Sequence, residues 1–286
     1  MRFLWIKKHW RNTVYSNVWI ALGAGLATWQ TTTIIGLSDS YLPWFVGIST
    51  LFTYNFQRLV KLNDRPEYIT AGRNNWLFRN RVTLRVITAL CALILLGLVW
   101  TLSPLTFIWL AIGGMLSLAY VVRLFSGSQS KKALRDLPFI KIYLIGLVWA
   151  MATVILPFIE LDNDLWQIDR LFLIVERFAF IVAITVPFEI RDMNLDRPNM
   201  KTPAQLFGIN GAKLYGLFWI VVAGTMITLN FSDGIYTSYE LYALWFSLIL
   251  SAVLIGASNP ERDEMYFTGW VDGTIIIQAV AFYLLS

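Results

Sequence analysis

Two aspartates that follow a long apolar run have the spacing of a pair that can hold a metal ion. Asp192 and Asp196 are four residues apart, and Glu189 precedes Asp192 by three. On a helix, this spacing places the three carboxylates on one face. Carboxylates at the end of an apolar helix can hold a hard cation such as Mg²⁺, which often bridges to phosphate. The alternative is a polar loop whose acids are neutralised by the neighbouring Arg191 and Arg197.

Several other catalytic arrangements lack their residues. His9, the only histidine, lies in a basic leader with no candidate nucleophile nearby, and Cys91, the only cysteine, lies within an apolar run. This excludes a disulfide framework and a cysteine-based zinc site. It also leaves a Ser-His-Asp or Cys-His mechanism without support. Asp272-Gly273 lacks the rest of the signature of membrane phosphatidyl-alcohol transferases.

The composition is that of an integral membrane protein. The 286 residues are 57% hydrophobic and only 14% charged, whereas a soluble domain carries about 25% charged residues. A membrane span needs about 20 mostly apolar residues, so the sequence predicts an all-α polytopic membrane protein, with nine transmembrane helices in one domain. The predicted spans are about 14–37, 41–60, 82–102, 104–124, 138–159, 171–190, 212–231, 239–257 and 266–285.

The basic residues alternate between the two sides of the predicted bundle. Of the 23 Lys and Arg residues, 21 lie in or beside the leader and the even-numbered loops, and the exceptions are Arg170 and Arg177. The positive-inside rule then places the N-terminus in the cytoplasm and the C-terminus outside, in the cell (inner) membrane. This bias accounts for the net charge of +5, and we expect no nucleic-acid partner.

Loop length favours the cytoplasmic face as the place of chemistry. Three cytoplasmic loops, roughly 61–81, 125–137 and 191–211, are long and rich in charged residues. Glu176 and Arg177 lie just inside the sixth predicted span, near its outer end. Intramembrane charges are functional candidates by default, but at this depth they can also snorkel or be neutralised locally. The structural interpretation is favoured for this pair.

A short string recurs after two of the predicted spans. Asp64-Arg65-Pro66 follows the second span and Asp196-Arg197-Pro198 follows the sixth. Repeats at this scale are common in membrane folds built from related halves, and chance is the alternative. The first half has cations where the second has acids, because Arg58 and Lys61 share a helical face there, with Asn55 beside Arg58.

These features resemble the UbiA-type family of intramembrane prenyltransferases. That family has nine transmembrane helices and two Asp-rich motifs, in the cytoplasmic loops after the second and sixth helices, which hold Mg²⁺ on the diphosphate of an isoprenoid donor. Its second motif resembles the stretch from Asp192 to Asp196, followed by Lys201, Thr202 and Gly208. The further matches are the basic residues Lys131, Lys132 and Arg135 between the fourth and fifth spans, and Tyr120 near the end of the fourth.

The first family motif, Asn-Asp-x-x-Asp-x-x-x-Asp, is degenerate in this chain. Asn55 matches the asparagine, but Phe56 and Leu59 replace the first two acids. Asp64 supplies the last acid only after a one-residue slip, and a second frame, which begins with the residue before Asp64, takes Glu67 as its second acid. At least one acid is missing in either frame, so a standard site for two Mg²⁺ ions is in doubt.

The resemblance implies an enzyme that moves an isoprenoid group from a polyprenyl diphosphate to a lipophilic or aromatic acceptor in the membrane, with Mg²⁺ assisting departure of the diphosphate. Fixed cations can supply part of the charge that a missing metal would bring. The predicted catalytic residues are Asp192, Asp196, Asn55 and Arg58; the predicted diphosphate-binding residues are Arg58, Lys61, Lys131, Lys132, Arg135, Lys201 and Tyr120; the predicted metal ligands are Asp192, Asp196 and Asp64.

Two further functions stay open at the level of sequence. A non-catalytic relative could bind a polyprenyl or lipid phosphate through the same basic loops, which the missing acids favour and the retained acid pair disfavours. A small-solute transporter would need polar groups at mid-membrane or spans broken by Gly and Pro. Pro187 and Gly113-Gly114 are weak signs of this kind.

Overall fold

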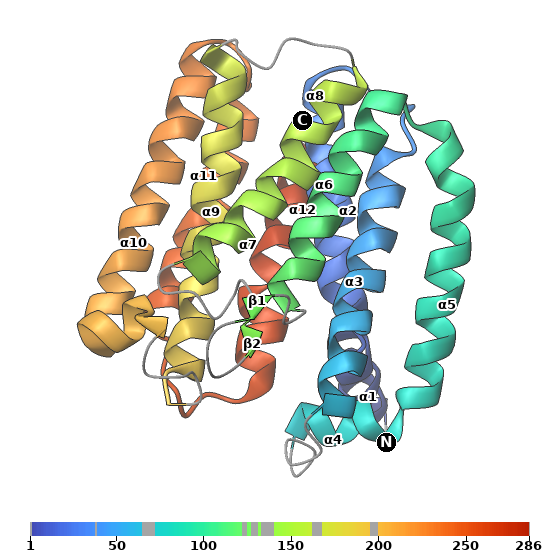
Figure 1. Cartoon of the computed structure of the whole chain (residues 1–286). Coiled ribbons are helices and arrows are strands. Elements are labelled where there is room, and N and C mark those ends of the chain that lie inside the picture. The colour runs from blue at the N-terminus through green and yellow to red at the C-terminus, as the bar shows by residue number, and fades with distance from the viewer. Residues whose placement is uncertain are drawn as a thin grey trace.

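The structure is a computed structural model that describes residues 2–37, 39–64, 72–121, 125–126, 131–132, 140–161, 168–194 and 200–285. Nearly all of these residues are helical (Figure 1). In chain order the helices are α1 (Arg2–Tyr15), α2 (Val18–Ile34), α3 (Leu42–Asp64), α4 (Gly72–Arg79), α5 (Arg81–Leu98), η2 (Val99–Thr101), α6 (Pro104–Val121), α7 (Ile140–Ala150), η4 (Met151–Ile155), α8 (Leu156–Glu160), α9 (Ile168–Asp192), α10 (Pro203–Ser232), α11 (Ser238–Gly256), η6 (Tyr266–Val271) and α12 (Gly273–Leu285). Two short antiparallel strands, β1 (Phe125–Ser126) and β2 (Lys131–Lys132), pair within a loop.

The predicted all-helical class is confirmed. Each of the nine predicted spans is largely helical over its described residues, but the first, 14–37, crosses the break between α1 and α2 at residues 16–17. Six helical segments are long and apolar enough to cross a membrane, namely Arg81–Thr101, Ile140–Glu160, Arg170–Asp192, Pro203–Ser232, Ser238–Gly256 and Tyr266–Leu285. The chain therefore has the helices of a membrane protein, whereas the count of nine crossings stays a prediction.

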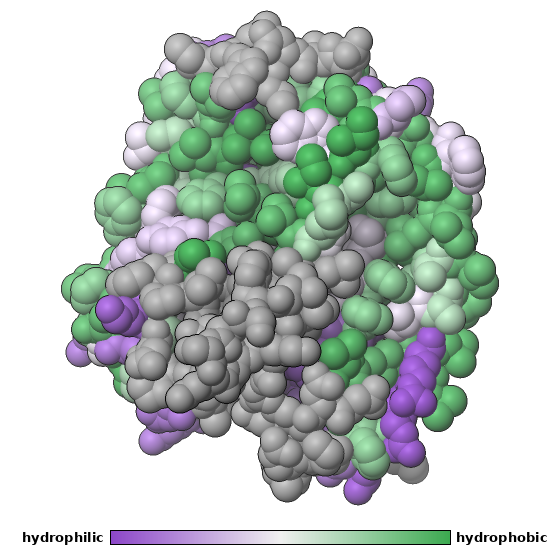
Figure 2. All heavy atoms as spheres, in the orientation of Figure 1, coloured by the Kyte–Doolittle hydropathy of each residue, from purple (hydrophilic) through white to green (hydrophobic). Residues whose placement is uncertain are grey.

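The outer surface is unusually apolar. Hydrophobic side chains make up most of the coloured surface in Figure 2, and strongly hydrophilic ones gather toward its lower end. Large apolar side chains such as Leu93 on α5, Val221 on α10 and Ile249 on α11 are more than half exposed. Soluble monomers rarely expose apolar patches of this extent, so these faces are suited to contact lipid.

Helix α9 packs against α7, α10 and α11. Its middle, residues 179–184, is buried all round, with Val182 and Ala183 fully inaccessible. A helix that is hydrophobic on every side belongs inside a bundle rather than on its surface. The polar residues at the two ends of α9 are therefore held in fixed places.

Near its start, α9 forms a packed polar cluster with α2, α10 and the loop before α11. Glu176 accepts hydrogen bonds from Asn230 Nδ2 (2.8 Å) and Tyr236 Oη (2.9 Å), and Arg177 donates to Gln30 Oε1 (3.1 Å). All five side chains are buried. These contacts agree with the structural role favoured for Glu176 and Arg177, because the two charges are bonded to neutral neighbours.

Local sequence signals explain how two helices begin and bend. Thr202 and Gln205 form a capping box at the start of α10, with Thr202 Oγ1 accepting from the Gln205 backbone N–H (3.4 Å) and Gln205 Oε1 accepting from the Thr202 N–H (3.3 Å). Pro203 follows at the first helical position, where its missing N–H costs nothing. Gly208 interrupts α10 with a φ of 68°, a conformation that glycine adopts without steric strain.

Candidate functional site

A cavity of about 680 Å³ lies among α3, α4, α7, α9 and the η6–α12 segment. Its charged lining residues are Arg58, Lys61, Arg73, Lys141, Glu189, Arg191, Asp192, Glu264 and Asp272, and its apolar ones include Ile20, Leu144, Ile145, Val148, Trp149, Ile181, Ile184 and Ile275. On α9 the lining extends from Ile181 to Asp192, about 16 Å along the helix axis at 1.5 Å per residue. The cavity thus combines a charged end with an apolar interior.

The charges gather because several helices end or begin at the same end of the bundle. Arg58 and Lys61 lie on the last turns of α3, Lys141 on the first turn of α7, and Arg191 and Asp192 at the end of α9. The N-terminus and α4 lie at this end, and the C-terminus lies at the opposite one (Figure 1). Residues far apart in sequence therefore meet around one opening.

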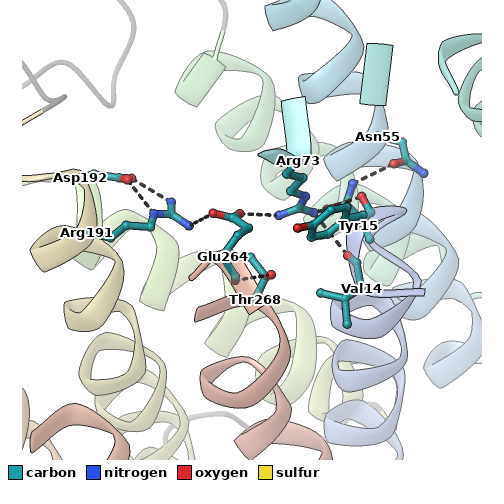
Figure 3. Close-up of polar contacts among 9 residues, drawn as sticks. Val14, Tyr15, Asn55, Arg73, Arg191, Asp192, Glu264 and Thr268 are labelled. Atoms are coloured by element: carbon teal, nitrogen blue, oxygen red, sulfur yellow. Dashed lines mark hydrogen bonds and ion pairs between the residues drawn. The ribbon is translucent and has the colours of Figure 1, made fainter. Parts of the chain in front are cut away.

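A row of ion pairs crosses the charged end (Figure 3). Arg191 grips both carboxylate oxygens of Asp192, through Nε (2.7 Å) and Nη2 (3.0 Å). Arg191 Nη1 donates to Glu264 Oε2 (3.2 Å), and Arg73 Nη1 donates to Glu264 Oε1 (3.4 Å). Glu264 therefore bridges two arginines that come from α4 and α9.

Arg73 is anchored from behind by the junction between α1 and α2. Its Nη2 donates to Asn17 Oδ1 (2.6 Å) and to the carbonyl oxygen of Tyr15 (3.3 Å). Asn17 has a left-handed backbone, with a φ of 64°, and its Nδ2 donates to Asn55 Oδ1 (2.8 Å). Burial, followed by the nearby charge of Arg58, lowers the pKa of Arg73 to about 10, so this guanidinium stays charged at neutral pH.

The first turn of α7 contributes a second ion pair. Lys141 Nζ lies 2.9 Å from Glu189 Oε1, and the Glu189 side chain is fully buried. The two residues join α7 to α9 at the cavity wall. Glu189 is therefore engaged by a cation on a neighbouring helix, as a buried carboxylate requires.

A widened helical turn, residues 266–271, forms part of the cavity wall together with the residues that flank it. Asp263 Oδ1 accepts from the backbone N–H of Tyr266 (2.9 Å) where the helix begins, and residues 266–271 then form a π-helix. Glu264, Thr268 and Asp272 follow one another at four-residue intervals and all line the cavity. Single π-turns occur frequently at functional sites. This one carries Thr268, with Glu264 just before it and Asp272 just after it, in an otherwise apolar segment.

The structure brings together only part of the predicted site. Arg58, Lys61 and Asp192 line the cavity. Asn55, predicted to be catalytic, is fully buried and lies behind Arg73, to which Asn17 connects it. Lys201 is exposed and is not among the lining residues. Asp196 and Arg135, and the side chains of Asp64, Tyr120, Lys131 and Lys132, lie outside the described part of the chain.

Sequence reasoning did not assign five charged residues of the cavity to a site: Arg73, Lys141, Arg191, Glu264 and Asp272. Arg191 was considered only as a base that neutralises the nearby acids. Arg73 and Lys141 were used only among the basic residues that indicate the cytoplasmic side. Glu264 and Asp272 did carry a usable signal, because with Thr268 they form a polar stripe of period four in an apolar run. Such a stripe marks one helix face that avoids lipid.

Contacts among the described residues do not fit a resident Mg²⁺ ion. Both oxygens of Asp192 are taken by Arg191, Glu189 pairs with Lys141, and Glu264 is shared by two arginines. Within the described ranges, no group of three or more His, Cys, Asp or Glu side chains could hold a metal ion. Mg²⁺ binding through Asp192 and Asp196 stays a prediction, since Asp196 lies outside those ranges.

The resemblance to prenyltransferases thus rests on the motif residues and is not a family assignment. Comparison with protein-family models, curated proteins and solved structures finds no match for this chain.

Proposed function

We propose that this protein binds a polyprenyl diphosphate in its cavity and transfers the isoprenoid group to a lipophilic or aromatic acceptor within the membrane. The observation that carries the proposal is a cavity of about 680 Å³ with five cationic side chains at one end and an apolar interior. Guanidinium and ammonium groups bind phosphate oxygens through charge-assisted hydrogen bonds. A hydrocarbon tail gains free energy when it leaves water for an apolar wall.

The five cations approach from four helices. Arg58 and Lys61 come from α3, and Arg73, Lys141 and Arg191 come from α4, α7 and α9. During transfer, the bond between the prenyl C1 and the diphosphate oxygen breaks, and negative charge grows on that oxygen. Positioned cations stabilise such charge without reorganising, which is the role we assign to these side chains.

The deeper walls suit the reacting prenyl group. Trp149, Ile181 and Ile184 line the interior, with Tyr54 and Phe188 nearer the charged end. Apolar walls exclude water, which would otherwise capture an allylic cation, and aromatic faces attract positive charge. The acceptor nucleophile forms the new bond to C1 and loses its proton.

The proposed orientation places the charged end toward the cytoplasm of the cell (inner) membrane. Support comes from the basic leader and α4, which lie at that end, and from the termini, which lie at opposite ends of the bundle (Figure 1). An odd number of crossings would separate the termini in this way.

A non-catalytic protein that binds a polyprenyl or lipid phosphate is the second candidate. The pairing of Asp192, Glu189 and Glu264 with cations favours it, because these described carboxylates are not positioned as metal ligands. The two candidates share the same ligand chemistry and differ in whether the C–O bond is broken.

The experiment that separates the candidates measures release of pyrophosphate. Purified protein is incubated with geranylgeranyl diphosphate and a lipid extract of native membranes as the source of acceptor. Release of pyrophosphate that is lost in Arg58→Ala and kept in Lys213→Ala supports the transferase, since Lys213 lies outside the cavity lining. Binding without release over several acceptor extracts supports the second candidate.

The Mg²⁺ prediction is tested in the same assay. If Asp192 and Asp196 hold the ion, binding of the diphosphate is strengthened by Mg²⁺ in the wild type but not in the double variant Asp192→Asn/Asp196→Asn. Binding that is equal with Mg²⁺ and with a chelator would leave the fixed cations as the sole phosphate ligands.

A further inference from the structure

Glu264 occupies the point on which two arginines converge inside the cavity. Arg73 and Arg191 each direct Nη1 toward this carboxylate, at 3.4 and 3.2 Å (Figure 3). Strong charge-assisted hydrogen bonds are shorter, about 2.7–2.9 Å. The bridge is therefore loose compared with the 2.7 Å contact between Arg191 Nε and Asp192 Oδ1.

Each arginine has a second anchor that does not involve Glu264. Arg73 Nη2 is held by Asn17 and by the carbonyl oxygen of Tyr15, whereas Arg191 uses Nε and Nη2 to hold Asp192. If Glu264 moved away, both guanidinium groups would stay in place. Two Nη1 donors would then converge on one vacated position.

The charges that line the cavity indicate that a carboxylate moves away from the cations when a diphosphate binds. Five cations face four acids in the cavity, so their excess of one cannot offset a diphosphate that carries two or three negative charges. Glu264 is the carboxylate best placed to move, because it lies at the start of a helical segment, two residues before η6, and its side chain is 26% exposed. Glu189, by contrast, is fully buried.

We propose that Glu264 is an internal substitute for a phosphate group, which holds the Nη1 atoms of Arg73 and Arg191 in the ligand-free protein and is displaced from them by the diphosphate. This inference rests on the proposed function, because it names the atoms that receive the ligand there. A carboxylate and a phosphate both present paired oxygens to a guanidinium fork. Glu264 then tunes affinity, since the ligand must compete with it.

Removal of the Glu264 charge should strengthen binding of the diphosphate. Glu264→Gln keeps the shape of the side chain and removes its charge, so the protein loses a competitor and a like charge near the phosphate. A unit charge several ångströms away in a partly aqueous site changes affinity by about three- to tenfold. If Glu264 instead served to position the arginines, the same substitution would weaken binding.

The experiment measures the Kd of inorganic pyrophosphate and of a fluorescent geranylgeranyl diphosphate analogue for the detergent-purified protein, at one fixed ionic strength. We expect Glu264→Gln to bind both probes about three- to tenfold more tightly than the wild type. The matched control is Glu261→Gln, which removes an exposed acid three residues earlier that lies outside the cavity lining. Its Kd should stay within about twofold of the wild type, since screening by salt weakens exposed charges.

Unchanged or weaker binding by Glu264→Gln overturns the inference and leaves the proposed function standing. If the wild type binds neither probe, the proposed function fails and the inference fails with it. Should Glu264→Gln not fold, Glu264→Asp provides the test, because it keeps the charge but withdraws it by one methylene. Tighter binding by Glu264→Asp, by a smaller factor, is then expected, and equal or weaker binding contradicts the inference.

Discussion

Helix α9 carries two charged clusters that differ in what their charges are bonded to. Near its start, Glu176 and Arg177 are hydrogen-bonded to the neutral side chains of Asn230, Tyr236 and Gln30, and none of these residues lines the cavity. At its end, Arg191 and Asp192 are bonded to each other and, through Glu264, to a second arginine beside the cavity.

This difference separates a structural role from a binding role. Glu176 and Arg177 are bonded to packed neutral side chains that do not line the cavity, although Arg177 Nη1 itself has no hydrogen-bond partner among the described residues. Their bonds therefore tie α9 to its neighbours. Charges that are engaged by one another around an open volume can exchange a partner for a ligand of the same charge. Burial alone does not distinguish the clusters, because Arg177 in the first and Arg73 in the second are both buried.

The largest expected effect comes from Lys141→Met, which leaves the buried Glu189 without its ion-pair partner. Breaking such a pair from one side costs about 3 kcal/mol of folding free energy. The double variant Lys141→Met/Glu189→Gln should recover most of this stability, as measured by unfolding in detergent. Because the cation is still missing, the double variant should bind the prenyl diphosphate analogue about tenfold more weakly than the wild type. If the double variant bound the analogue as tightly as the wild type, the pair would have a structural role and no role in binding.

Glu176→Leu should affect only stability. It leaves Asn230 Nδ2 and Tyr236 Oη without their acceptor, which costs about 2 kcal/mol in total. The affinity of the remaining folded protein for the diphosphate analogue should equal that of the wild type. Asp39→Asn, at an exposed acid, is the control for loss of a negative charge. A large loss of affinity in Glu176→Leu would mean that the two clusters are coupled.

Asn17→Gly tests the anchor behind Arg73. Glycine keeps the left-handed backbone at this position, where φ is 64°, and removes the side chain that accepts from Arg73 Nη2. We expect diphosphate affinity to fall about tenfold, equivalent to 1.4 kcal/mol, as Arg73 loses its orientation. An unchanged Kd would show that the carbonyl oxygen of Tyr15 is a sufficient anchor.

Thr202→Ala should have the smallest effect. Thr202 matches a threonine of the family motif, but in the structure it caps α10 together with Gln205. Loss of a helix cap costs about 1 kcal/mol, which unfolding measurements should detect, whereas the Kd for the diphosphate should not change. A tenfold loss of affinity would instead make Thr202 a ligand-binding residue.

The sequence largely predicted the helices, but not their exact ends or the short elements that connect them. Each predicted span is largely helical, since apolar runs of this length have few alternatives, but the break between α1 and α2 inside the first span was not predicted. Helix α10 begins at Pro203 instead of residue 212, because a capping box and not hydropathy defines its start. The short helix α4, which carries Arg73, and the π-turn at residues 266–271 left no signal in hydropathy.

The site was predictable only where its residues lie close together in sequence. The spacing of residues within a single helix or loop indicated Asp192, Arg58 and Lys61. All three line the cavity. The contact between Arg73 and Glu264 joins residues 191 positions apart, which no local pattern reveals. Asn55 was assigned to catalysis by motif, whereas the structure gives it a place behind Asn17.

The central claim is that the charged end of the cavity binds a diphosphate while its interior holds a prenyl tail. The most direct test is the affinity of the detergent-purified protein for a fluorescent geranylgeranyl diphosphate analogue, compared with the same analogue as its free alcohol. We predict saturable binding of the diphosphate that is at least about tenfold tighter than that of the alcohol, and that is lost in Arg58→Ala/Arg191→Ala. Equal affinity for the two analogues, or binding that survives both substitutions, would contradict the account.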